Sequence, residues 1–478
     1  MRSRSGLHKN RMSEPPAHFE GPSDFDGSGS FRTIHGADMT AECCFFLPQT
    51  EIAKIWMLIR TTTQTLIAFS WKFSCKLRVE GLSLTADEVF HSGWTSWNWG
   101  AGDENSLIGE VTKLTIAQGD AQNSAITSVR FFLTPSSLLR SADIVSVQEG
   151  NVRIVKTART GPKCAATENI CFQFNSSYQA DPSGRSRQSV HCDVVEPILI
   201  EQPTEAAEIL DDVLTLAALA EGRNILVTGW EARYENGAHV KYYRRDFAAP
   251  QKDKVDIDDT LISLNNIEPF LNSSAKKLAT LGSRNALKQA IHFTLSGHRP
   301  SIESSFMVLF SALETLLNVF RSLEDLETII PKARWGRLRL EVCAMLAQDE
   351  AVRGLTPDRR TALENRVAQL NQISFPDAFR GMCGSYNIEL GDLWPMLGAK
   401  EAGLYALRNR IVHGRLFTSD SEWFRLASAK YHLLWTLQRS VLAFLDWPLD
   451  RSRVSSHSLS LRTFYSSWRD DHQYFLSL

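Results

Sequence analysis

The chain has 478 residues, enough for two or three domains of ordinary size. Hydrophobic residues make up 43% and charged residues 22%, proportions that exclude a wholly disordered chain and are typical of a globular protein. The formal net charge is −2, which excludes a strong overall attraction to nucleic acid or to an anionic membrane. Residues 284–444 nevertheless contain 20 Lys and Arg against 16 Asp and Glu, a balance of +4 that leaves −6 elsewhere. A mildly basic module of this kind permits a site for a polyanion.

The cysteines and the N-terminus predict a cytoplasmic protein. None of the eight cysteines forms a CxxC pair, so reduced and mostly buried thiols are expected. The spacing of Cys164, Cys171, His191 and Cys192 matches no compact zinc motif, and no metal or other cofactor is expected. The basic residues near the N-terminus have no apolar segment behind them, unlike a signal peptide. No run approaches the roughly 18 apolar residues of a membrane span.

The first half of the chain predicts a disordered segment followed by a β-rich domain. Residues 1–38 are rich in Ser, Gly, Pro and charge, so we expect them to be disordered. Residues 39–250 alternate short apolar runs with turn-like stretches, as in a sandwich-like or barrel-like domain. Within it, Asn236-Gly237 predicts a type I′ hairpin turn, and Thr204–Ala220 predicts one helix. The apolar runs are Leu66–Phe73, Ile126–Leu133, Val152–Lys156, Ile170–Phe174 and Ile198–Ile200.

A tryptophan cluster in this half has two interpretations. Trp94, Trp97 and Trp99 could stack a ligand, or they could pack in a β core. Ordinary packing is the favoured interpretation.

The second half predicts a helical bundle. A charged linker over 251–283 is followed by apolar residues at helical spacing from 284 to 447, and by a tail over 448–478. The fold class is therefore α+β, with an N-terminal β-rich domain and a C-terminal α-helical bundle. The expected helices are Asn285–Leu295, one around Phe306–Phe320, one around Trp335–Leu346, Thr356–Leu370, Glu401–Val412 and Glu422–Leu445. The last has apolar residues such as Leu426 and Leu437 on one side and polar residues such as His432 and Arg439 on the other.

Arg408 and His413 are the candidate catalytic residues. On a helix, Arg408 lies at the edge of the apolar face formed by Leu404 and Leu407. A partly desolvated guanidinium needs an acceptor. Gly414 is typical of the residue that follows a helix end, so His413 is expected at the terminus, where its imidazole can turn towards Arg408.

Glu314 and Asn409 are expected to support this pair. Glu314 projects from the flank of the long helix around Phe306–Phe320, where its carboxylate can accept from Arg408. The spacing of Arg and His alone is a weak signal, because six other Arg–His pairs have four to six residues between them, for example Arg185 and His191. The adjacent Asn409, the His-Gly helix end and the Ala-Leu-Glu sequence on an earlier helix distinguish Arg408 and His413.

A basic run on the third expected helix is a candidate RNA-binding surface. Such a run is most often a solvated helix face, and less often a contact to an RNA backbone. It consists of Lys332, Arg334, Arg337 and Arg339.

The combination of Arg408-Asn409-x-x-x-His413-Gly414 with Ala312-Leu313-Glu314 resembles the HEPN superfamily, especially the ApeA-type HEPN proteins of bacterial anti-phage defence. The resemblance covers roughly 280–445, and 210–247 looks more loosely like the N-terminal half of such proteins. It implies a HEPN-like bundle and a metal-independent endoribonuclease that works as a homodimer. It also implies an RNA substrate, a toxin-like antiviral role, and an N-terminal domain that senses a phage-derived trigger.

The residue types suit that chemistry. RNA supplies its own nucleophile, the 2′-hydroxyl, and histidine can transfer protons near neutral pH. Arginine is a fixed donor to phosphate oxygens. Three alternatives remain: a structural role for Arg408, Glu314 and His413 in helix stability; a catalytically inactive HEPN module that dimerises or binds nucleic acid; and a HEPN protein modified by a separate nucleotidyltransferase.

Overall fold

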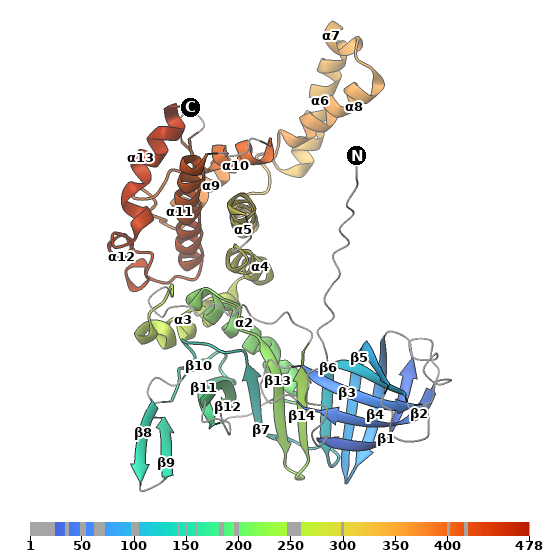
Figure 1. Ribbon diagram of the computed structural model, residues 1–478. Helices are drawn as coiled ribbons and strands as arrows, with labels where there is room; N and C mark the ends of the chain where they lie inside the picture. Colours follow the sequence, from blue (N-terminus) through green and yellow to red (C-terminus); the bar gives the residue numbers. More distant parts are fainter. Residues whose placement is uncertain are drawn as a thin grey trace, which may run out of the picture. The chain divides into compact units, whose positions relative to one another are not determined.

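The computed structural model describes residues 24–33, 38–47, 54–61, 72–96, 105–140, 144–149, 152–157, 160–180, 186–195, 200–245, 260–297, 301–398, 402–414 and 419–477. The chain divides into two compact units, residues 1–214 with 225–254 and residues 215–224 with 255–478 (Figure 1). The first is built from strands and the second from helices, so the predicted α+β class is confirmed.

The strands of the described first unit form one large sheet and one separate hairpin. The hairpin is β8 (Ile144–Glu149) with β9 (Val152–Thr157). The large sheet contains β1 (Phe25–Thr33), β2 (Asp38–Phe46), β3 (Ile55–Thr61), β4 (Lys72–Val79), β5 (Leu82–Ser96), β6 (Asn105–Gln118), β7 (Ile126–Leu133), β10 (Lys163–Ala165), β11 (Cys171–Ala180), β12 (Ser186–Val195), β13 (Val227–Tyr234) and β14 (His239–Arg244).

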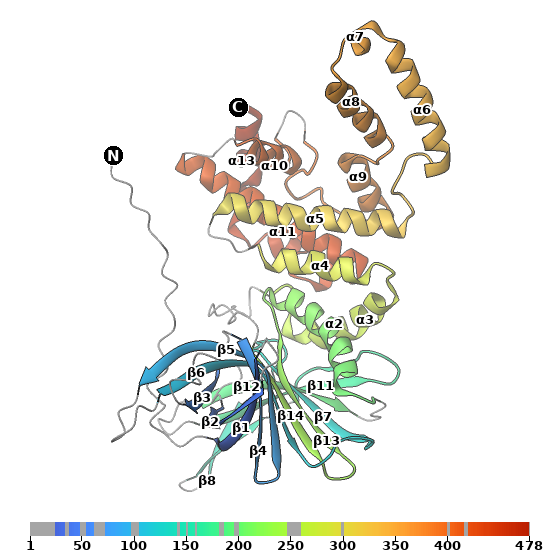
Figure 2. The same cartoon turned by 90° about the vertical axis from the view of Figure 1, so that its right-hand side faces the viewer.

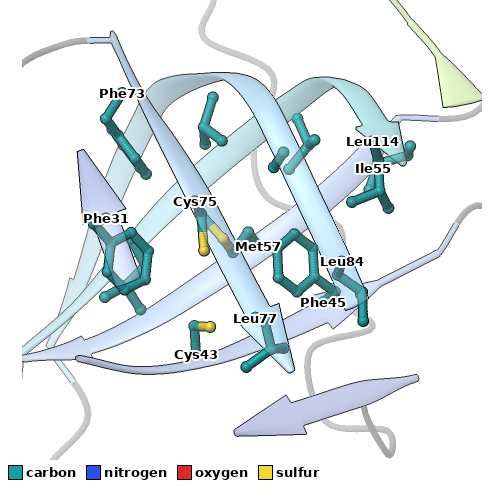
Figure 3. Close-up of a cluster of buried hydrophobic side chains, with 14 of the residues drawn as sticks. Phe31, Cys43, Phe45, Ile55, Met57, Phe73, Cys75, Leu77, Leu84 and Leu114 are labelled. Carbon is teal, nitrogen blue, oxygen red and sulfur yellow. The ribbon is translucent and has the colours of Figure 1, made fainter. Parts of the chain in front are cut away.

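The sheet closes on itself through β6, so it is a barrel with an open extension and not two packed sheets. One edge of β6 pairs with β5, and the other pairs first with β3 and then with β14. The order β6-β3-β2-β1-β4-β5 thus returns to β6, while β14-β13-β7-β12-β11-β10 continues outwards. Alternating apolar residues such as Phe45, Met57 and Leu84 fill the barrel (Figure 3).

The N-terminal prediction was wrong for part of its range. Residues 25–33 were expected to be disordered, yet β1 pairs with both β2 and β4. Its glycines favoured disorder, but Gly29 lies where the thiols of Cys43 and Cys75 close over the strand, at 2.9 and 3.2 Å from the position of a Cβ. The remainder of 1–38 lies outside the described residues, apart from 24 and 38.

The hairpin prediction is confirmed, but its turn type was wrong. β13 pairs with β14 as expected. Gly237 has a φ of +81°, whereas Asn236 is not among the described residues with positive φ. Tyr234 O accepts from Gly237 N, and Tyr234 N donates to Ala238 O, each over 3.0 Å. The turn is therefore a three-residue loop with a glycine bulge. The backbone of Asn236 does not adopt the left-handed conformation, and its side-chain amide donates to Asp120 O.

The other β predictions have mixed outcomes. The runs beginning at Ile126 and Val152 coincide with β7 and β9, and the run from Ile170 falls largely on β11. Most of Leu66–Phe73 and of Ile198–Ile200 lies outside the described residues. So do Trp97, Trp99 and the side chain of Trp94, which leaves the tryptophan cluster a prediction. The expected helix is α2 (Pro203–Glu221), whose last turns belong to the second unit.

In the second unit, α4, α5 and α11 form the centre. α5, with eleven buried residues, packs against both α4 and α11 (Figure 2). The helices are α3 (Ile267–Thr280), α4 (Arg284–Leu295), α5 (Ile302–Leu323), α6 (Lys332–Gln348), α7 (Glu350–Arg353), α8 (Pro357–Gln369), α9 (Phe375–Ser385), α10 (Leu404–Val412), α11 (Asp420–Phe444), α12 (Ser456–Leu459) and α13 (Thr463–Ser477), with 3-10 turns η2 (Leu264–Asn266) and η3 (Leu449–Arg451).

Two predicted irregular segments are structured. The expected linker 251–283 contains η2 and α3, and α3 buries Phe270 and Leu271. The expected tail 448–478 contains η3, α12 and α13, and α13 packs on α11. α13 was missed because its apolar residues are sparse: it buries only Trp468 and Phe475. α3 was missed because the charged residues over 253–259 favoured a linker. The bundle therefore extends beyond 284–447 on both sides.

The third predicted helix forms but does not enter the core. No residue of α6 is buried, and Leu340 and Met345 are 70% and 71% exposed. α6 and α8 make a helical hairpin whose base is held by Asn371, which bonds both N and O of Ile330. α8 matches the helix expected over Thr356–Leu370: Thr356 is its N-cap residue, without a side-chain cap bond, and Pro357 lies in its first turn.

α5 is also the one described helix whose length and composition would suit a membrane span. Half of its most apolar stretch is buried inside the protein, as in the core helix of a bundle.

Candidate functional site

α10 positions the Arg408–His413 segment by burying one face. Leu404 and Leu407 are fully buried. The helix begins after Gly403 without a side-chain cap and ends at Val412. His413 is its C-cap residue, and the His413 N–H donates to Asn409 O over 3.0 Å. Gly414 follows with a φ of +77°, a conformation that glycine adopts without strain. The predicted helix end at His-Gly is confirmed.

Arg408 is held at the helix edge by three groups. Its Nη2 donates to Glu314 Oε1 over 3.2 Å, and its Nη1 donates to the neighbouring Asn409 Oδ1 over 3.2 Å. The guanidinium carbon lies 5.6 Å from the ring centroid of Phe310, at cation–π distance. The side chain is 27% exposed, so it is oriented by the protein while still reachable from solvent.

Glu314 reaches this site from α5, 94 positions away in the sequence. Its side chain is 43% exposed, more than a buried counter-ion would be. The expected pairing with Arg408 is confirmed, and the pair lies at the protein surface. A half-exposed ion pair contributes little to stability, so its clearest consequence is the orientation of the guanidinium.

His413 is exposed and shares no hydrogen bond with Arg408 in the described residues. Val412, His413 and Gly414 are all exposed. Among the described residues, no hydrogen bond or ion pair joins the His413 side chain to Arg408. The expectation that the imidazole turns towards Arg408 stays a prediction. An accessible imidazole at a helix end is free to meet a substrate or a second protomer.

The basic run on α6 faces solvent. Each of its four side chains is exposed. Lys332 Nζ lies 3.2 Å from Glu327 Oε2, which offsets part of its charge.

An aromatic cluster beside Arg408 was missed by the sequence analysis. Tyr405 stacks on Phe375 of α9, with ring centroids 4.7 Å apart and planes 14° apart. Phe310 contacts both rings. The one signal in the sequence is that Tyr405 precedes Arg408 by three positions and so shares its side of the helix. Phe375 carries no such signal, because only the tertiary structure brings α9 to α10.

A second polar cluster, also missed, lies on the predicted polar side of α11, which is buried. Arg439 donates from Nη1 and Nη2 to the two carboxylate oxygens of Asp392, over 2.6 and 2.8 Å. The Tyr465 hydroxyl of α13 donates to the same carboxylate. Burial alone would raise the pKa of Asp392, but bonds from Arg439, Ser456 and Tyr465 hold it well below its usual range.

His432 belongs to the same cluster. Its Nδ1 accepts from the backbone N–H of Trp394, and its Nε2 donates to a backbone carbonyl of α13. The bond at Nδ1 needs the neutral ring, because a protonated nitrogen cannot accept, and burial lowers the pKa of His432 to about 4. Through these hydrogen bonds, the cluster holds α13 and residues 389–394 against α11.

The zinc alternative gains no support from the described residues. No group of three or more His, Cys, Asp or Glu side chains within them is arranged to hold a metal ion. Cys164 and Cys192 are fully buried, and burial raises the pKa of Cys192 well above its usual value. Such thiols are poor nucleophiles and poor ligands.

Comparisons were made with family models, with curated proteins and with solved structures. None of the three finds a match for this chain.

Proposed function

We propose that the chain is a HEPN-type endoribonuclease that cleaves RNA without a metal ion. The observation that carries the proposal is the hydrogen bond from Arg408 to Glu314, which joins two motif segments lying 94 positions apart. A guanidinium held by a carboxylate, an amide and an aromatic face keeps donors in a fixed direction for a phosphate. An exposed histidine lies five residues further along the same helix.

The reaction needs a proton acceptor, a proton donor and a stabiliser of negative charge. The imidazole of His413 takes the proton of a 2′-hydroxyl, and the 2′-oxygen attacks the adjacent phosphorus. Arg408 stabilises the charge that builds up on the phosphorane oxygens. The bond to the 5′-oxygen breaks, and that oxygen takes a proton from a second imidazole. The products are a 2′,3′-cyclic phosphate and a 5′-hydroxyl.

Because each chain supplies one such histidine, the proposal includes a two-fold homodimer. In a two-fold dimer the same surface of each protomer faces its copy, so two imidazoles and two guanidinium groups meet. The exposed position of Val412 and His413 is compatible with such an arrangement. The exposed basic run of α6 would contact the RNA backbone.

By resemblance to ApeA-type proteins, the proposal extends to a toxin-like effector of anti-phage defence in the cytoplasm. The N-terminal barrel unit would then sense a phage-derived trigger. This part of the proposal rests on fold-level analogy alone.

The competing function is a catalytically inactive HEPN module that dimerises or binds nucleic acid. One observation favours it: among the described contacts, His413 has no hydrogen bond or ion pair that would orient its ring for proton transfer. A catalytic histidine is usually oriented by such a partner.

The test uses the full-length chain and an unpaired RNA of mixed sequence, with DNA of the same sequence as control. We expect cleavage that persists in EDTA, spares the DNA and leaves a cyclic phosphate end. His413→Ala should abolish the cleavage. Cutting only with added divalent metal, or equal cutting of DNA, would rule out attack by the 2′-hydroxyl.

A further inference from the structure

The aromatic cluster beside Arg408 extends from the core to the surface. Phe310 and Phe379 are buried, whereas Phe375 and Tyr405 are half-buried. The ring planes of Phe379 and Phe375 lie 4° apart, and those of Phe375 and Tyr405 lie 14° apart. Tyr405 is therefore the outer member of a nearly parallel series of three rings.

The guanidinium and this series of rings share one residue. Phe310 of α5 lies under Arg408 at 5.6 Å and contacts Phe375 and Tyr405 at 5.2 and 6.1 Å. Arg408 and Tyr405 therefore lie next to each other on the same buried ring. A phosphate bound by Arg408 and a nucleobase stacked on Tyr405 would consequently be neighbours. Core packing accounts for the buried rings, but it does not require two aromatic rings at the solvent edge.

We propose that the outer ring, Tyr405, backed by Phe375, is a platform on which an unpaired nucleobase stacks while Arg408 binds a neighbouring phosphate. The assignment rests on the proposed function, and it specifies the substrate as single-stranded RNA. Bases stack on aromatic side chains only when they are unpaired and splayed out. Because every base has an aromatic face, the platform selects for single strands without selecting a sequence.

Binding tests the platform separately from cleavage. The protein carries His413→Ala so that the RNA stays intact, and the probes are a short unpaired oligonucleotide and the same oligonucleotide with one abasic position. Tyr405→Leu should weaken binding of the intact probe by about 5- to 150-fold, the usual loss for one stacked base. Tyr405→Phe, which keeps the ring, should bind like the parent. The abasic probe should bind weakly to the His413→Ala protein, and adding Tyr405→Leu should not weaken its binding further.

A matched control variant is Tyr431→Leu. Tyr431 of α11 is also half-buried and stacks on Phe464 of α13, with centroids 4.8 Å apart and planes 18° apart. It should lose similar packing without loss of binding. A probe containing 2-aminopurine adds a direct signal in the parent protein, because stacking on Tyr405 should quench its fluorescence even if Tyr405→Leu fails to fold.

The outcomes separate this proposal from the proposed function. Equal binding of intact and abasic probes, no quenching, or parent-like binding by Tyr405→Leu would overturn the platform, whether or not the protein cleaves RNA. Quenching and base-dependent binding, together with a chain retaining His413 that leaves RNA intact, would support the platform and overturn the nuclease.

Discussion

Arg408 on α10 donates a hydrogen bond from Nη2 to Oε1 of Glu314 on α5, over 3.2 Å. The two side chains are 27% and 43% exposed, so the ion pair contributes little to the free energy of unfolding. Its main effect is to orient the Arg408 guanidinium. Activity and stability should therefore respond differently when the pair is broken.

Glu314→Ala should lower the cleavage rate by about 100-fold, because a misplaced guanidinium no longer meets the charge that develops on the phosphate. The free energy of unfolding should change by no more than about 1 kcal/mol, as is usual for a solvent-exposed ion pair. Glu314→Gln, which keeps an acceptor oxygen in place, should retain part of the rate. Initial rates and thermal unfolding measure the two effects. Unchanged activity in Glu314→Ala would remove the pair from the site.

His413→Ala should abolish cleavage while the free energy of unfolding stays within about 1 kcal/mol of the parent. The reason is that the side chain is exposed, and substitutions at exposed positions seldom change stability. Chemical unfolding and the RNA assay can use the same preparation. A large loss of stability would instead identify His413 as a structural helix cap.

If the protein is a homodimer, its mass in solution at micromolar concentration should be that of two chains. Each protomer supplies one copy of His413, and the proposed chemistry uses two imidazoles. Light scattering measures the mass directly. Full nuclease activity from a protein that is monomeric under assay conditions would contradict the shared site.

Asp392→Ala should destabilise the helical unit by about 3–5 kcal/mol, because it leaves the Arg439 guanidinium buried without its counter-ion. The Arg439 side chain is 1% exposed. Tyr465→Phe, which removes one hydrogen bond to the same carboxylate, is the matched control and should cost about 1 kcal/mol. Calorimetry of the full chain compares them. Equal effects from the two variants would show that Asp392 is not the main partner of Arg439.

Acid should weaken the helical unit between about pH 6.5 and pH 4 through His432. The pKa of this buried ring is lowered from 6.5 to about 4, so in that window the unfolded chain binds a proton that the folded chain does not. The stability contribution is complete above pH 6.5 and declines as the pH falls, by about 3 kcal/mol in total. Asp392 titrates at lower pH, because its own pKa is held below the usual range.

The measurement is the unfolding midpoint at a series of pH values, in the parent and in His432→Gln. The glutamine variant should show a shallower decline over this window, because it has no ring to protonate. The pKa values of His191 and His472 are also lowered by burial, and both remain in the variant, so the difference between the two curves isolates His432. Parallel curves would show that His432 does not cause the decline.

The sequence alone determined the features that depend on local spacing. The 3.6-residue period gave the positions of α4, α5, α10 and α11, because each helix buries a continuous face. The His-Gly pair marked the end of α10, since glycine adopts a positive φ without strain. Glu314 was identifiable as the partner of Arg408 because both lie at the edge of an apolar face, where a charge needs a counter-charge.

Tertiary structure decided the features that depend on contacts between distant segments. Closure of the barrel through β6 follows from pairings along both edges of one strand, which no local pattern encodes. α13 packs on α11, where buried His432 bonds a backbone carbonyl of α13 and Tyr465 of α13 donates to the carboxylate that pairs with Arg439. A polar helix face by itself predicts exposure to solvent instead. The stack of Phe375 on Tyr405 exists only because α9 meets α10, so the residues proposed to bind a base became visible only in the fold.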